Sequence, residues 1–101
     1  MVAMDGSILQ RIVEEREELL AIMARHGARN PRIFGSVVRG EAHAGSDIDF
    51  LVDMDMGRSL IDLISLQQEL EVRLARRVDV VTSPSLNRHM RDRILREARP
   101  L

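Results

Sequence analysis

Two aspartates in one apolar run constrain this chain more than any other feature. Asp47 and Asp49 belong to the segment Asp-Ile-Asp-Phe-Leu-Val, which covers residues 47–52. Alternate side chains of a β-strand point to the same face, so the two carboxylates would project together, roughly 6–7 Å apart. Carboxylates at that separation can share two divalent cations about 3.5–4 Å apart. The segment therefore predicts a strand that carries a metal-binding pair of acids.

Ten residues separate this pair from a turn of small residues, Gly35-Ser36, which directly follows the apolar run Ile33-Phe34. A small-residue turn leaving a strand exposes backbone N–H groups that can hold phosphate oxygens. Gly35 would let the backbone approach a phosphate, and Ser36 would donate from its N–H and its hydroxyl. A phosphate-binding turn beside a carboxylate pair is the equipment of a phosphoryl or nucleotidyl transferase.

A third acid, Asp79, lies between β-branched neighbours in the run Val78–Val81. A charge in a strand that otherwise belongs in a core costs several kcal/mol unless it is paired or binds a metal. Two interpretations follow: Asp79 completes the metal site, or it forms a structural ion pair with Arg76 or Arg77.

Other polar residues near the motif also have a functional and a structural interpretation. The guanidinium fork of Arg39 suits either a triphosphate contact or a clamp on a nearby carboxylate. Ser46 is interpreted as an orienting hydroxyl rather than a nucleophile, because no base stands beside it in the sequence. Asp53 and Asp55 repeat the Asp-x-Asp spacing, but they lead into a turn with Gly57, where solvated acids are ordinary.

The ordered set of motifs, apolar-Gly-Ser, then Asp-apolar-Asp-apolar, then apolar-Asp-apolar, resembles the polymerase-beta-like nucleotidyltransferase superfamily. The Gly-Ser-Val-Val-Arg-Gly and Ser-Asp-Ile-Asp runs are most similar to its minimal branch, often encoded as the antitoxin of a HEPN-domain toxin. The resemblance covers residues 33–81 and implies AMP transfer from ATP, with the toxin's tyrosine hydroxyl as acceptor. It implies two Mg²⁺ ions, which Mn²⁺ can replace. It also implies roles for seven residues: catalysis and metal binding for Asp47, Asp49 and Asp79, and nucleotide binding for Gly35, Ser36, Arg39 and Ser46.

Composition excludes several other functions. All fifteen basic residues are arginines, so a P-loop, which needs a lysine at the phosphates, is absent. The chain has no tyrosine and therefore cannot modify itself on one. A net charge of −1 argues against nucleic acid as the main partner. No run approaches the ~18 apolar residues of a membrane span, so a cytoplasmic location is expected.

The 101 residues predict one domain, 1–101, of the α+β class, with a small mixed β-sheet and helices packed on one face. Periodicity and capping residues predict helices over 7–26, 59–76 and 85–96, strands over 32–34, 48–52 and 78–81, and a loop over 37–46. Ser7, Ser59 and Ser85 are the expected helix caps. The apolar positions expected to face the core of the first two helices are Ile8, Leu9, Ile12, Val13, Leu19, Leu20 and Met23, then Leu60, Leu63, Ile64, Leu70 and Leu74.

Roughly twenty residues follow the third strand, too few for an acceptor-binding domain. We therefore expect a protein partner to present the acceptor hydroxyl, and association of identical copies is compatible with the sequence. Two alternatives stay open at this stage. The protein could neutralise a toxin by occlusion without chemistry, or it could transfer nucleotides to RNA or to a small molecule.

Overall fold

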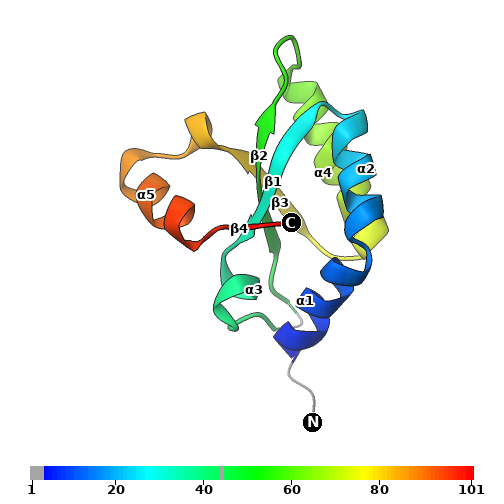
Figure 1. The fold of residues 1–101 in the computed structure, drawn as a ribbon, viewed down its shortest axis with the longest axis vertical. Helices are drawn as coiled ribbons and strands as arrows, with labels where there is room; N and C mark the ends of the chain where they lie inside the picture. Colours follow the sequence, from blue (N-terminus) through cyan, green and yellow to red (C-terminus); the bar gives the residue numbers. More distant parts are fainter. Residues whose placement is uncertain (1–3, 44) are drawn as a thin grey trace.

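The computed structural model describes residues 4–43 and 45–101, with side chains from residue 8 onward. A four-stranded sheet crosses the molecule, with helices on both of its faces (Figure 1). Within the described residues the elements follow in the order α1 (Met4–Glu14), α2 (Arg16–Arg25), β1 (Ala28–Phe34), α3 (Ser36–Arg39), β2 (Ile48–Met54), α4 (Leu60–Leu74), β3 (Val78–Thr82), η1 (Ser83–Ser85), α5 (Arg88–Glu97) and β4 (Arg99–Pro100).

The sheet has the strand order β3-β2-β1-β4 and is mixed. Strand β1 pairs antiparallel with β2 and with β4, whereas β2 and β3 are parallel. The long helix α4 forms the crossover that a parallel pair requires. The predicted α+β class with a small mixed sheet is confirmed. The helices were predicted on one face only, and this part is wrong, because α5 packs on the face opposite α2 and α4.

Alternation along the strands divides the core into two parts. Ile48, Phe50 and Val52 of β2 point into the larger cluster, which α1, α2 and α4 cover. Leu51 points to the other face, where it packs with Phe34, Leu86 and Ile94 of the α5 side. In Figure 1, α2 and α4 accordingly lie on one side of the sheet and α5 on the other. Asp49 lies on the same face as Leu51, so the acids of the motif belong to the α5 side.

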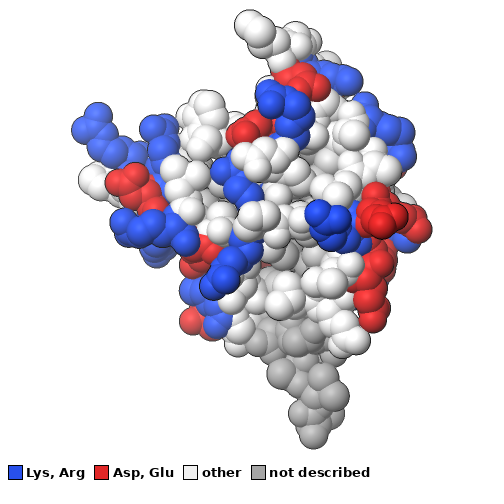
Figure 2. All heavy atoms as spheres, in the orientation of Figure 1, with Lys and Arg blue, Asp and Glu red and all other residues white. Residues whose placement is uncertain are grey.

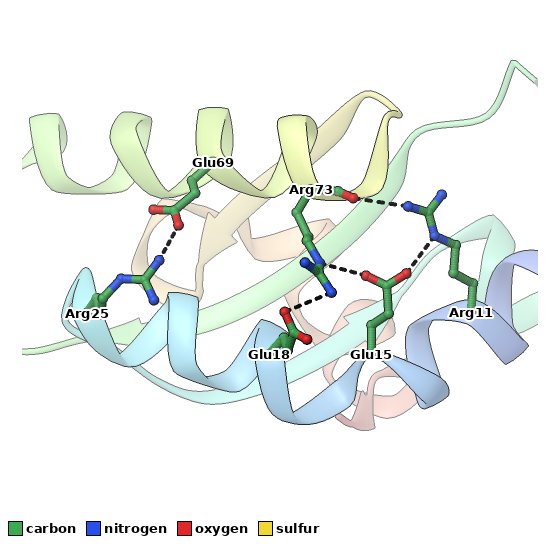
Figure 3. A network of polar contacts seen from close by, with 6 residues as sticks. All are labelled: Arg11, Glu15, Glu18, Arg25, Glu69 and Arg73. Atoms are coloured by element: carbon green, nitrogen blue, oxygen red, sulfur yellow. Dashed lines mark hydrogen bonds and ion pairs between the residues drawn. The ribbon is translucent and has the colours of Figure 1, made fainter.

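The segment 7–26, predicted as one helix, is divided at Glu15 into α1 and α2. The Glu15 carboxylate accepts hydrogen bonds from Arg11 of α1 and from Arg73 of α4, both at 2.8 Å. Figure 3 shows these contacts together with the pairs Arg73–Glu18 and Arg25–Glu69. Exposed ion pairs of this kind contribute about 0–1 kcal/mol each, so the network aligns the helices more than it stabilises them. Ser7 is not the cap, because α1 begins at Met4.

Several apolar positions predicted to be buried are exposed. Leu9 and Val13 are 40% and 62% exposed, because each lies one residue, about 100° of helical turn, beyond the buried Ile8 and Ile12. In α4 the buried stripe is Leu66, Leu70 and Leu74. The predicted Ile64 lies about 200° from Leu66 and is 47% exposed, and Leu60 is 69% exposed.

Element ends also differ from the prediction. Strand β1 begins at Ala28 and includes Asn30-Pro31, which form a bulge where the register shifts between Arg29 and Arg32. The predicted loop 37–46 contains most of helix α3, and its residue Ala44 lies outside the described residues. Asn87, rather than Ser85, caps α5 by accepting a hydrogen bond from the Met90 N–H.

The two-residue strand β4 was not predicted. Among the described residues, no helix combines the length and the apolarity that crossing a membrane requires.

Candidate active site

The parallel pairing of β2 and β3 brings the predicted acids together. Asp49 and Asp79 are register partners on adjacent strands, which lie about 4.8 Å apart in any sheet. Asp47 stands just before β2, two positions from Asp49, and so projects toward the same face. Asp79, which follows Asp49 by thirty positions in the sequence, therefore lies beside it at the edge of the α5 side, and Asp47 lies two positions before Asp49.

The charges of Asp49 and Asp79 are not neutralised by an ion pair. Burial raises the pKa of the half-buried Asp49 carboxyl, and the negative charges of Asp79 and Asp47 raise it further, to about 6 from an ordinary 3.8. Arg39 opposes this increase only in part. Within the described residues, no arginine lies in ion-pair contact with Asp49 or Asp79. Mutual repulsion of this kind is what a bound cation would relieve.

Asp47 lies at the N-terminal end of β2, and its side chain is partly exposed. Its Oδ1 lies 3.1 Å from Arg77 Nε, but the two groups are not aligned for a hydrogen bond, and the buried Oδ1 has no donor. The Arg77 side chain is 79% exposed, so this ion pair is screened by solvent and weak. The structural role offered for Arg77 is thus realised with Asp47, not with Asp79.

These residues fit a divalent metal by the chemistry of their donors. Mg²⁺ and Mn²⁺ prefer carboxylate oxygens, and the cluster offers an unpartnered oxygen on Asp47 and an unneutralised Asp49. Among the described residues, no three acidic or histidine side chains are close enough together to hold a metal ion as they stand. The acids therefore form an open, two-strand platform.

Gly35 places the backbone of the turn after β1 directly against this platform. It adopts φ +83° and ψ −153°, a region that side chains rarely enter. A Cβ atom at this position would lie 2.2 Å from Asp49 Oδ2. Glycine is therefore required here by both conformation and space. Ser36 follows as the first residue of α3, next to the pocket but not in its lining.

Glu97 links the turn at Gly35 to the side chain of Arg39. The Arg39 guanidinium donates to Glu41 from Nε at 2.9 Å and to Glu97 from Nη1 at 2.8 Å. Hydrogen bonds to these two carboxylates raise the pKa of Arg39. Glu97 also accepts a hydrogen bond from the Gly35 N–H at 2.7 Å. Of the two interpretations offered for Arg39, the carboxylate clamp is the one that the structure displays.

Glu97 is a site residue that sequence reasoning missed. Burial raises the pKa of its carboxyl, but the hydrogen bonds from Arg39 and from the Gly35 N–H outweigh burial and hold the pKa below its usual range. Nothing in the Arg-rich segment 88–97 distinguishes Glu97 as a partner of a turn sixty-two positions earlier.

A pocket of about 260 Å³ brings these groups together between the sheet and α5. Its polar part is formed by Gly35, Arg39, Asp49, Asp79, Arg93 and Glu97. The remaining lining comes from apolar side chains of the sheet, of the residue after η1 and of α5, namely Phe34, Val81, Leu86, Met90 and Ile94. Arginines gather over α5 beside this pocket (Figure 2). The pocket can hold a ligand with an anionic end and an apolar end.

Ser46 has a different place from the one predicted. Its hydroxyl accepts a hydrogen bond from the His43 N–H at 2.9 Å, and its carbonyl oxygen accepts one from Arg76 at 2.6 Å. These contacts close the loop before β2. Ser46 is not in the lining of the acidic pocket, so the structure does not bring it together with Gly35 and Asp49.

Asp53 and Asp55 are neutralised, as solvated turn acids should be. Asp53 pairs with Arg32 at 3.1 Å and accepts a hydrogen bond from Asn30, and Asp55 pairs with Arg29. Both arginines belong to β1, the antiparallel neighbour. The second Asp-x-Asp therefore differs from the first in its charge balance, not in its spacing.

Comparisons with known proteins agree with this geometry. Residues 9–101 match the family model described as nucleotidyltransferase domain. A Methanocaldococcus jannaschii protein, provisionally named a protein adenylyltransferase, is 44% identical over 87 residues, which make up 86% of this chain and 94% of the relative. The protein adenylyltransferase MntA of Thermococcus cleftensis is 41% identical over 90 residues, or 84% of this chain and 91% of the relative.

Solved structures show the same fold. A structure provisionally described as a minimal nucleotidyltransferase has a TM-score of 0.83 and 46% identity, and the match covers 92% of this chain and 95% of that one. A chain from a toxin–antitoxin structure with AMP-PNP has a TM-score of 0.71 over 83% of this chain and 69% of its own length. Its identity is 22%, so this second likeness shows the fold alone.

Proposed function

The chain belongs to the nucleotidyltransferase domain family, and on this premise we propose that it transfers AMP from ATP to a hydroxyl group of a partner protein. The observation that carries the proposal is the meeting of Gly35 with Asp49 and Asp79 in one pocket. A backbone turn that accepts phosphates and an unneutralised pair of acids are the two parts that nucleotidyl transfer needs.

The family generally uses a nucleoside triphosphate and a divalent metal. Here Asp47, Asp49 and Asp79 would hold Mg²⁺, as two ions, or Mn²⁺ in its place. The bound metal supplies charge neutralisation at the triphosphate and lowers the pKa of the acceptor hydroxyl. Asp47 Oδ1, which has no hydrogen-bond donor, and the exposed Asp79 are free to contribute.

The chain's own groups position the reactants. Gly35 and Ser36 bind the β- and γ-phosphates, so that pyrophosphate leaves in line with the attacking oxygen. The acceptor oxygen forms a bond to the α-phosphorus, the bond from that phosphorus to pyrophosphate breaks, and Asp79 takes the hydroxyl proton. The apolar wall of Leu86, Met90 and Ile94 would exclude water from the opposite side of the pocket.

We further propose that the acceptor belongs to a toxin of the HEPN ribonuclease type and that its tyrosine hydroxyl receives the AMP. Relatives with 41–44% identity are named protein adenylyltransferases, and a chain with the same fold occurs in a toxin–antitoxin structure with AMP-PNP. In this role the chain is the antitoxin and acts in the cytoplasm. A partner that brings its own tyrosine fits a chain that has none.

The test is the mass of the partner after incubation. The purified chain is mixed with a candidate HEPN-domain toxin, ATP and Mg²⁺, and the intact mass of that toxin is measured. We expect added AMP with the wild type, and none with Asp79→Asn. Asp55→Asn is the matched control, because it removes the same charge from an acid that pairs with Arg29 outside the pocket.

Tight binding of the two proteins with an unchanged partner mass would refute the transfer reaction. In that case the partner would be neutralised by occlusion. AMP on an RNA or a small alcohol, with none on the protein, would refute the proposed acceptor.

A further inference from the structure

We infer that Glu97 is an internal anion that occupies the phosphate-binding donors of the site and leaves when a triphosphate binds. The inference rests on the proposed function for the identity of the ligand, but it concerns a residue that takes no part in the proposed transfer reaction. Glu97 would then be a specificity-determining residue, because a ligand must replace its charge to enter.

The contacts of Glu97 are those expected of a phosphate oxygen pair. Its Oε2 accepts from the Gly35 N–H at 2.7 Å, and its Oε1 accepts from Arg39 Nη1 at 2.8 Å. Both distances are in the range of charge-assisted hydrogen bonds. The side chain is only 15% exposed, so the carboxylate lies inside the pocket rather than at its rim. The Glu97 carboxylate therefore occupies one backbone donor and one arginine donor.

The carboxylate of Glu97 matches this pair of donors. A glutamine could not accept both hydrogen bonds in the same geometry, because one of the two oxygens would become an N–H donor. Arg39 and Arg93 of the pocket favour the negative charge of Glu97, whereas Asp49 and Asp79 oppose it. Glu97 therefore occupies, with one negative charge, the same donors that a phosphate would use.

The fold allows the carboxylate to leave without unfolding its helix. Glu97 is the last residue of α5, and the chain then turns at Ala98 into β4. Strand β4 is held by pairing with β1 at Arg32 and Ile33, so the backbone beside Glu97 stays anchored. Rotation of the Glu97 side chain is enough to vacate both donors. Arg39 remains oriented after this rotation by its second contact, with Glu41.

This arrangement selects for highly charged ligands. A monovalent anion would replace the carboxylate with one equivalent charge, so its binding would be only weakly favourable. A triphosphate brings several charges and further contacts to Ser36 and to the acid-bound metal, so it can displace Glu97. The site therefore rejects simple anions while it remains open to nucleoside triphosphates.

The experiment is a calorimetric titration of the full chain in Mg²⁺ buffer with ATP, inorganic tripolyphosphate and adenosine. Wild type is compared with Glu97→Gln and with the matched control Glu41→Gln. Both glutamates bind Arg39, but of the two only Glu97 reaches Gly35. We expect Glu97→Gln to bind ATP and tripolyphosphate about tenfold more tightly, which is about 1.4 kcal/mol at 25 °C. Adenosine binding should not change. Glu41→Gln removes an acid from Arg39 but leaves Glu97 on Gly35, so it should not bind ATP or tripolyphosphate more tightly than the wild type.

Equal or weaker binding of tripolyphosphate by Glu97→Gln would overturn the inference, because a structural tie loses affinity when it is altered. An equal gain for Glu41→Gln would also overturn it. If Glu97→Gln does not fold, Glu97→Asp serves instead: it keeps the charge but is one methylene too short to reach both donors. Tighter tripolyphosphate binding by Glu97→Asp supports the inference and unchanged binding refutes it. Because these titrations contain no acceptor protein, their outcome is separate from that of the transfer reaction.

Discussion

Replacing Gly35 with alanine should damage both stability and transfer, and the two losses have separate causes. The backbone at φ +83° and ψ −153° costs a non-glycine residue about 1–3 kcal/mol of unfolding free energy. The added Cβ would also lie 2.2 Å from Asp49 Oδ2, so the half-buried carboxylate must move by about 1 Å to restore contact distance. A misplacement of that size can reduce kcat/KM about 100-fold, or roughly 2.7 kcal/mol of transition-state stabilisation.

Gly57→Ala is the matched control for this variant. Gly57 also has a positive φ, +87°, but a Cβ there would meet no atom within 4 Å. Urea denaturation of the two variants compares the conformational costs, and AMP transfer to the partner isolates the contact with Asp49. We expect both variants to lose stability and only Gly35→Ala to lose transfer. Wild-type transfer by Gly35→Ala would refute the assignment of this turn to the phosphate site.

Two further predictions concern the acids. The double variant Asp47→Asn, Asp49→Asn should abolish transfer. Because it removes the repulsion between carboxylates, the Tm of the metal-free protein should be equal to that of the wild type or higher. Retained transfer would contradict the metal assignment. The pKa of Asp49 is about 6 in the folded protein, above its ordinary 3.8, so the folded state binds the proton more strongly than the unfolded state does. The metal-free protein should therefore lose stability as pH rises from about 4 to 6. Asp49→Asn should flatten this dependence in urea denaturation series with a chelator, and an unchanged slope would count against the burial of that carboxyl.

The parts of the fold that follow from local periodicity could be predicted. Strand 48–52 and strand 78–81 were expected from alternating apolar residues, and both occur, each with one or two further residues. The meeting of Asp49 with Asp79 was expected from the motif, and the parallel register realises it. Errors arose where one residue of helical phase decides burial, as at Val13 and Ile64.

The parts of the site that depend on distant contacts could not be predicted. The hydrogen bond from Gly35 to Glu97 joins residues sixty-two positions apart, and it depends on where α5 ends against the sheet. Ser46 was placed at the site because it precedes the acids in the sequence. In the loop its hydroxyl instead satisfies the His43 N–H, a local interaction that competes with any ligand contact.

The two Asp-x-Asp segments at the ends of β2 differ in whether arginines neutralise them. Both present carboxylates two positions apart, and the chain has fifteen arginines that could neutralise them. At Asp53 and Asp55, β1 supplies Arg32 and Arg29 across the antiparallel pairing. At Asp49, β1 supplies Phe34 as the register partner, followed by Gly35, which has no side chain, so backbone rather than a cation faces the acid. The negative charge of Asp49 therefore remains because β1 and the turn after it place no cation beside this carboxylate. A metal-bound triphosphate would bind through this charge.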